Sequence, residues 1–300
     1  MRISTSLLYQ RATIAILDQQ AKMAQTELQL ASGKKVLKPS DDPAAATRIL
    51  DLNRYIDTIE QYQDNAGVAE ARLELEESTL ASATELMQRA YELAVQGNND
   101  SLNAGDRQAL AKEVDQLQEA LLGLANTKDA NGEYLFSGFQ RDTRPFNDLG
   151  GGRFGYNGDQ GQRLLRISAD RQVADNESGF EVFMDVPSSG GGAQSAFASL
   201  YNLSQALKND LATTTSIDDV RSAMDKFLQV RAQAGARLNA VREQKDANEA
   251  FKITIQTQLS KEEDLDYAEA VSRFNQETLA LQAAQQAYLK MQGLSLFNYM

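Results

Sequence analysis

The sequence predicts a mainly α fold: a long, coiled-coil-like rod built from N- and C-terminal segments, with a small β-rich insertion in the middle. Two observations carry this prediction. Glycine is concentrated in the centre, where 12 of the 19 glycines fall between Gly132 and Gly192. Both flanks are rich in Ala, Gln, Leu, Glu and Arg, which lose little rotamer freedom in a helix.

The N-terminal segment predicts a first helix with a narrow apolar stripe. Apolar side chains recur at steps of three and four, a spacing typical of a coiled-coil seam, with one interruption at Gln10. The stripe consists of Ile3, Leu7, Ile14, Leu17, Ala21, Ala24, Leu28 and Ala31. Gly33 ends this helix, and Pro39 and Pro43 follow. The side-chain oxygens of residues 40–42 can then cap a second helix.

Helical periodicity also predicts further helices on both sides of the centre. The second helix should run from about residue 43 to residue 95, and about fifty helical residues span roughly 75 Å. The third, over about residues 106–128, should fold back antiparallel on the second. Periodicity resumes near residue 193 and continues to the C-terminus with an interruption at residues 213–216, which predicts two more long helices.

The glycine-rich centre predicts short strands. Between Arg141 and Pro187, apolar side chains alternate with polar ones, as in Phe154 and Tyr156. We therefore predict three domains: terminal helices that form an inner coiled coil, a helical rod domain, and a small β-rich outer domain. The predicted ranges are 1–42 with 265–300 for the terminal helices, 43–140 with 193–264 for the rod, and 141–192 for the β-rich domain.

The composition removes whole classes of chemistry. The chain has no Cys and no His, which excludes Cys/His zinc sites, Ser-His and Cys-His nucleophile pairs, and disulfides. We predict no cofactor and no metal site. The net charge of −12 argues against a nucleic-acid partner, because such surfaces need clustered Lys and Arg. No stretch approaches the roughly 18 apolar residues of a membrane span, and none resembles a cleavable secretory signal, so we expect no membrane partner.

Three local motifs could suggest chemistry, but each has a simpler structural explanation. The GxGxxG spacing at Gly150–Gly155 is not followed by a predicted helix, which favours a β-turn over a dinucleotide site. The acidic runs at residues 74–77 and 262–266 lie on predicted helices, where neighbouring side chains point to different faces, so we interpret both as solvated helix faces. Residues 129–133 faintly resemble a calcium loop, but Thr127 occupies the first ligand position, which favours a turn.

The last helix carries a broad apolar stripe, which we expect to be buried against another surface. Its members are Val271, Phe274, Leu281, Ala284, Ala287, Tyr288, Met291 and Leu294, accompanied by Phe297 and Tyr299. Insertion into a membrane surface usually requires a Lys- and Arg-rich polar face, and the last thirty residues offer only Arg273 and Lys290. A partner helix is therefore the preferred receiver of this stripe.

Four segments of the chain share a pattern with one known family. They are MRISTSLLYQ at the start, LASGKKVLKPSDDPAAATRIL from Leu30 to Leu50, ANGEYLFSGFQRDTRPF from Ala130 to Phe146, and LALQAAQQAYLKMQGLSLFNYM at the end. Together they resemble the flagellin superfamily, and within it the hook-associated junction proteins. The resemblance covers both ends and most of the helical scaffold.

This resemblance implies a structural protein of the bacterial flagellum that is needed for motility, is not an enzyme, and is secreted by type III export to the hook-filament junction. The implied partners are another hook-associated protein on the hook side, flagellin on the filament side, further copies of this chain in a ring of the axial tube, and a flagellar export chaperone. Axial assembly is assigned to Ile3, Leu7, Ile14, Leu17, Ala21 and Leu28. Chaperone and later partner binding is assigned to Val271, Phe274, Leu281, Ala284, Tyr288, Met291 and Leu294.

Three alternatives stay open at this point. The chain could be a flagellin filament subunit, although residues 39–43 read PSDDP where flagellins usually carry an alanine-rich segment. A generic coiled-coil scaffold would explain the helices but not the four family-like segments. A carboxylate-dependent enzyme would need acids of the β-rich insertion to converge. The candidates for such a site are Asp159, Asp170, Asp175 and Glu181.

Overall fold

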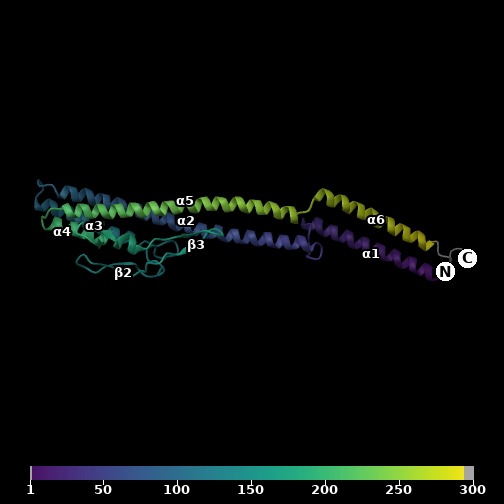
Figure 1. Cartoon of the computed structure of the whole chain (residues 1–300). Helices are drawn as coiled ribbons and strands as arrows, with labels where there is room; N and C mark the ends of the chain where they lie inside the picture. Colours follow the sequence, from purple (N-terminus) through teal and green to yellow (C-terminus); the bar gives the residue numbers. More distant parts are fainter. Residues whose placement is uncertain (1, 294–300) are drawn as a thin grey trace. The chain divides into compact units, whose positions relative to one another are not determined.

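The chain folds into long α-helices with short strands between residues 146 and 194. The computed structural model describes residues 2–293, and the side chains of residue 7 and of residues 9–291. The helices are α1 (Arg2–Ser32), α2 (Pro43–Gly97), α3 (Ala104–Ala125), α4 (Ala196–Lys208), α5 (Thr214–Glu263) and α6 (Tyr267–Gly293), and Phe180–Met184 forms a π-helical turn, η1 (Figure 1). The strands are β1 (Phe146–Asp148), β2 (Phe154–Tyr156), β3 (Leu164–Arg166), β4 (Gln172–Ala174), β5 (Val186–Pro187) and β6 (Ala193–Gln194).

The predicted fold class, mainly α with a small β-rich part in the middle, is confirmed. The strands form three separate antiparallel pairs, β1 with β2, β3 with β4, and β5 with β6. Within residues 2–293, no helix is both long and apolar enough to cross a membrane.

The chain divides into two compact units. The first consists of Met1–Thr58 and Phe251–Met300, and the second of Ile59–Ala250. Both α2 and α5 contribute residues to each unit. The three-domain division stays a prediction.

Polar side chains fix the starts of several helices. Asp42 Oδ1 accepts the backbone N–H of Ala45 at 2.9 Å at the start of α2. A capping box opens α3, in which the side chains of Asn103 and Asp106 each accept the other residue's backbone N–H. Ser195 caps α4 without a capping box: its hydroxyl oxygen accepts the backbone N–H of Ala198 at 3.0 Å. These boundaries therefore follow from local sequence.

In the first unit, α1 and α6 form an antiparallel pair, so that the start of α1 lies beside the end of α6 (Figure 1). The hydroxyl of Tyr9 donates to the carbonyl oxygen of Met291 at 3.2 Å. Further along both helices, Gln19 Nε2 donates to the carbonyl oxygen of Glu277, also at 3.2 Å.

A break at residues 264–266 divides the C-terminal helical region. The prediction of two long helices after the centre is wrong, because three helices are present there, α4, α5 and α6. Leu265 N–H donates to the carbonyl oxygen of Gly33 at 2.9 Å, which pairs the break with the turn after α1. Asp266 Oδ1 then accepts the N–H of Ala268 at 2.9 Å and caps α6. The break thus combines a local helix cap with backbone pairing to a segment near the N-terminus.

In the second unit, α3 folds back antiparallel on α2, as predicted. Arg107 Nε in the first turns of α3 donates to the carbonyl oxygen of Gly97 at the end of α2, at 3.0 Å. Deeper in both helices, Arg89 Nε donates to Glu113 Oε1 at 2.7 Å.

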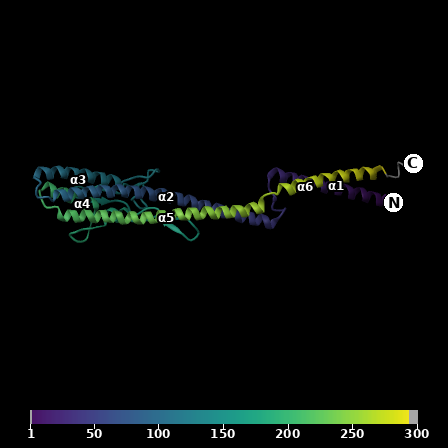
Figure 2. The same ribbon diagram turned by 90° about the horizontal axis from the view of Figure 1, so that it is seen from above.

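Charged pairs run between α2 and α5, which lie side by side (Figure 2). Arg231 Nη2 lies 2.6 Å from Glu77 Oε1, and Arg242 Nε lies 2.9 Å from Glu70 Oε1. Lys245 also reaches Glu70, at 2.6 Å. Hydrogen bonds from Lys245 and Arg242 lower the pKa of Glu70 below its usual value.

An aromatic cluster joins the strands to the helices. The buried ring of Phe183 in η1 lies 5.1 Å from Phe136, 5.2 Å from Phe146, 5.6 Å from Phe197 in α4, and 5.2 Å from Phe227 in α5, measured between ring centroids. These rings belong to the same buried core as the apolar faces of α2 and α3. The segment that carries the strands, residues 146–194, which we call the strand-bearing segment, therefore packs as part of the helical core.

The glycine-rich motif forms a hairpin turn. Gly150, Gly151 and Gly152 have φ of +78°, +64° and +75° between β1 and β2, a conformation that disfavours residues with a Cβ. A strand follows the motif, not the helix N-terminus that a dinucleotide site needs, so the interpretation as a β-turn is confirmed.

Candidate assembly surface

One face of α1 is apolar and open to solvent. The predicted N-terminal stripe lies on this face, which we call the outer stripe: Leu7, Ile14, Leu17, Ala21 and Leu28. Ile14 and Leu17 are each 58% exposed, and Leu28 is 57% exposed. The side chain of Ile3, the remaining member of that prediction, lies outside the described residues.

The opposite face of α1 packs on α6. It also follows a three-and-four repeat, which we call the inner stripe: Tyr9, Ala12, Ile16, Gln19, Met23, Thr26 and Leu30. The rings of Tyr9 and Tyr288 meet edge to face at a centroid distance of 6.1 Å. Gln19 and Thr26 bring polar groups into this contact, and Gln29 beside it is 7% exposed. The stripe that the sequence analysis singled out is therefore not the seam between α1 and α6.

On α6, the predicted C-terminal stripe mostly faces α1. Leu281 is 8% exposed, and Phe274, Ala284, Tyr288 and Met291 are partly buried. Two members are instead exposed: Val271, at 47%, and Ala287. The last member, Leu294, lies outside the described residues.

Large apolar side chains also point outward from α6. Leu279 is 68% exposed and Leu289 is 64% exposed, together with Val271. The α1–α6 pair thus presents apolar side chains to solvent as well as within its contact, which also contains polar groups, and a helix pair that stays in water is expected to have a polar outer face. Exposed apolar surface of this kind is typical of a site that another protein covers.

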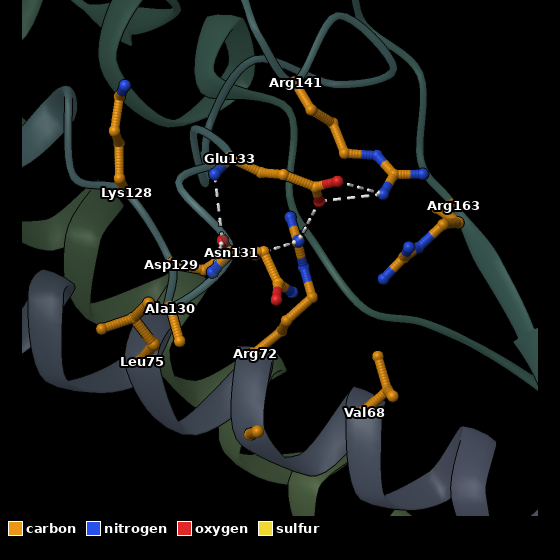
Figure 3. A pocket seen from close by; sticks show the side chains of 11 residues that line it. Val68, Arg72, Leu75, Lys128, Asp129, Ala130, Asn131, Glu133, Arg141 and Arg163 are labelled. Atoms are coloured by element: carbon orange, nitrogen blue, oxygen red, sulfur yellow. Dashed lines mark hydrogen bonds and ion pairs between the residues drawn. The ribbon is translucent and has the colours of Figure 1, made fainter.

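A cluster of charges in the second unit joins α2 to the strand-bearing segment. It contains Arg72, Asp129, Glu133, Arg141 and Arg163, which Figure 3 shows, and in addition Asp175. Arg72, whose side chain is 8% exposed, places Nη1 at 2.7 Å from Asp129 Oδ2 and at 3.1 Å from Glu133 Oε2. Arg163 pairs with the buried carboxylate of Asp175. A cavity of about 580 Å³ lies beside these groups.

Each guanidinium group of this cluster already faces a carboxylate. Arg141 Nη1 donates to both oxygens of Glu133, at 2.9 and 2.8 Å, and Arg72 lies between Glu133 and Asp175. The cluster is therefore a neutralised network that holds the strand-bearing segment on α2. Asp129 Oδ1 also accepts the N–H of Asn131 and of Glu133, which confirms the interpretation of this loop as a turn.

The acidic run on α2 is only partly solvated. Glu74 and Glu77 form ion pairs with Arg242 and Arg231 of α5. Glu76, however, is 0% exposed, so the interpretation of the whole run as a solvated face is wrong for this residue. Its burial depends on segments far along the chain that cover this part of α2, and the local sequence carries no signal of it.

The other acidic groups have separate structural roles. Glu262 pairs with Arg48 at 2.8 Å, and Asp266 caps α6. Among the four acids that an enzyme would need, Asp170 and Glu181 are exposed, whereas Asp175 is buried against Arg163. The part of the chain that the structure describes brings no three His, Cys, Asp or Glu side chains together as a metal site.

Comparison with known proteins supplies the family. The model of the bacterial flagellin N-terminal helical region matches residues 3–141, and that of the C-terminal helical region matches residues 217–300. The chain is 31% identical over 318 residues to flagellar hook-associated protein 3 of Escherichia coli (strain K12), with 99% of both chains covered. The chain belongs to the flagellar hook-associated protein 3 family. It is thus a component of the flagellum, in a family of structural proteins.

A solved structure with the same fold and a partial match to a flagellin complete the comparison. The crystal structure of flagellar hook-associated protein 3 from Legionella pneumophila has a TM-score of 0.67 and 24% identity, and the match covers 71% of this chain and 98% of that one, which supports the shared fold. A flagellin of Clostridium tyrobutyricum is 30% identical over 109 residues, only 36% of this chain. The full-length match therefore favours the hook-associated family over the filament flagellins.

Proposed function

We propose that this chain is the adaptor between the flagellar hook and the flagellin filament, and that its role is structural, not catalytic. The observation that carries this proposal is the outer stripe of α1, an uncovered apolar face in a chain that matches hook-associated protein 3 over its full length. In this role the outer stripe joins neighbouring subunits axially, and burial of its side chains drives assembly. A soluble enzyme has no evident use for such a face.

The proposed partners follow from this position. Another hook-associated protein would contact the chain on the hook side, flagellin would add on the filament side, and further copies would complete a ring of the axial tube. We place the assembled protein outside the cell, after type III export. The three-domain division belongs to the same proposal, with the terminal helices innermost.

The location can be tested with a single cysteine, because the natural chain has none. Ser189 lies exposed between β5 and β6, so Ser189→Cys should accept a thiol-reactive fluorophore without disturbing the core. We expect one fluorescent spot at the base of each filament on living cells, and no label on cells that express the cysteine-free chain. Label along the whole filament would instead indicate a flagellin. If cells expressing folded, reactive protein gave no extracellular label, the flagellar placement would be wrong.

For the export chaperone, we propose the predicted C-terminal stripe on α6 as the binding site. Since most of this stripe contacts α1, the chaperone would bind chains in which α1 and α6 are apart and would cover the stripe until assembly.

Truncation of the chain after Ala270 is expected to abolish chaperone binding, because it removes every member of the C-terminal stripe. Co-purification of the flagellar chaperone with the truncated and full-length chains measures this. A chain that lacks residues 1–13 and begins at Ile14 is a useful comparison, since it keeps the whole C-terminal stripe and should still bind the chaperone. Chaperone binding to the chain that ends at Ala270 would disprove this assignment.

A further inference from the structure

The carboxyl group of Glu76 in α2 is buried and forms no ion pair with an Arg or Lys side chain among the described residues. Glu76 is 0% exposed, and neither Oε1 nor Oε2 makes a hydrogen bond of good geometry among the described residues, although the backbone N–H of Glu177 lies close by. An ionised carboxylate in such a place loses its hydration without regaining equivalent interactions. The neutral, protonated form is therefore strongly favoured.

The charged groups that face Glu76 come from three elements. Glu177, in the segment between β4 and η1, brings a second carboxylate close by, and its own side chain lies 2.6 Å from Arg237 of α5. Arg237 and, on α2 itself, Arg72 favour the ionised form of Glu76, but both guanidinium groups already face other carboxylates. The backbone N–H of Glu177 acts in the same direction.

The balance of these groups favours the proton. Burial, followed by the negative charge of Glu177, raises the pKa of Glu76 to about 8. Burial is also the main cause that raises the pKa of Glu177. Glu76 thus lies at a place where α2, α5 and the strand-bearing segment meet, and it keeps its proton at neutral pH.

We propose that Glu76 is a proton-coupled latch: when the segment that carries Glu177 separates from α2 and α5, the Glu76 carboxyl releases its proton to water. In the closed state Glu76 is neutral, and the pair of Glu177 with Arg237 stays intact beside it. In the open state Glu76 is hydrated and ionised. At neutral pH, closing takes the proton back, so each opening event releases about one proton from Glu76 and each closing event takes up about one.

The direction of the pH dependence follows from the raised pKa. Between the ordinary carboxyl value of 4.5 and about 8, the closed state holds one proton more than the open state. The closed state is therefore fully stabilised at the acidic end of this window and loses stability as pH rises. The opening equilibrium constant should rise about tenfold per pH unit and become level above about pH 8.

Hydrogen exchange of the purified full-length chain measures this opening. Exchange is followed by mass spectrometry at several pH values between 5.5 and 9, and the rates are corrected for the intrinsic pH dependence of amide exchange. Peptides that cover residues 172–184 should show an opening constant that rises about tenfold per pH unit up to about pH 8. Peptides from α3 serve as the internal reference and should stay level after the same correction.

Two substitutions separate the latch from a general effect of charge. Glu76→Gln removes the main titrating group at nearly constant volume and should remove most of the slope, leaving only what the raised pKa of Glu177 contributes, whereas Glu74→Gln, which changes an exposed neighbour paired with Arg242, should keep the full slope. Glu177→Gln removes the nearby like charge and releases Arg237, which lowers the pKa of Glu76. The opening constant should therefore stop rising at a lower pH than in the unsubstituted chain. A flat profile in the unsubstituted chain, or an undiminished slope in Glu76→Gln, would overturn the proposal. An equal slope in α3 would also overturn it, since the opening would not be local.

Discussion

Replacement of Ile14 and Leu17 with glutamine is expected to abolish filament assembly and leave the isolated fold intact. Both side chains are 58% exposed in the free chain, so their loss removes little packing within it. In an assembled interface each would be buried, and full burial of a Leu or Ile side chain contributes roughly 1.5–3 kcal/mol. The two substitutions together would then weaken subunit association by about 3–6 kcal/mol, which lowers the association constant by on the order of a hundredfold or more.

This effect is measured as the fraction of cells that carry filaments and as swimming motility when the variant replaces the natural chain. Gln20→Ser, on an exposed flank of α1 between the two stripes, is the matched control and should support normal filaments. Circular dichroism of the purified variants checks that their helical content is unchanged. Normal filament numbers with the double variant would show that the outer stripe of α1 is not an assembly surface.

Phe183→Ala should destabilise the second unit more than other single truncations in its core. The ring is fully buried and contacts four other phenylalanine rings, from the loop after α3, β1, α4 and α5. Truncation of a buried Phe removes its apolar contacts and leaves a cavity that the neighbours fill only in part, which lowers the free energy of unfolding by about 3–5 kcal/mol. Urea unfolding followed by circular dichroism measures this change.

Phe139→Ala is the matched control for this substitution. The ring of Phe139 is 62% exposed, so the same chemical change should alter the free energy of unfolding by no more than about 0.5 kcal/mol. Similar losses for both variants would mean that the aromatic cluster does not stabilise the unit. A large loss for Phe183→Ala alone would show that the strand-bearing segment and the helices depend on one shared core.

Most of the fold was predictable because its signals are local. Helix starts are marked by side chains a few residues away, as at Asp42 and Ser195, and the glycines at positions 150–152 mark a turn that needs positive φ. The break before α6 was predictable only in part. Asp266 caps α6 locally, but Leu265 also pairs with Gly33, a contact that joins distant parts of the chain.

The candidate sites also combine features that local sequence predicts with features that depend on contacts between distant segments. Periodicity established that α1 carries an apolar stripe, but α1 has two three-and-four repeats on opposite faces, and spacing alone does not say which one faces α6. The more apolar repeat predicts the coiled-coil stripe, yet the inner stripe from Tyr9 to Leu30 forms the intramolecular contact. Hydrophobicity predicts that an apolar helix face will be buried, but it does not say whether the surface that buries it belongs to the same chain or to another protein.

The long helices, the glycine-rich centre with its short strands, and the family are all predictable from the sequence, because each is carried by local propensity, spacing or direct similarity. Which face of α1 stays open, and the burial of Glu76 alone in its acidic run, are visible only in the folded chain. The physical reason is that burial and the pKa of a carboxyl are set by what surrounds it, and the groups around Glu76 come from α5 and from the strand-bearing segment, which only folding brings to α2.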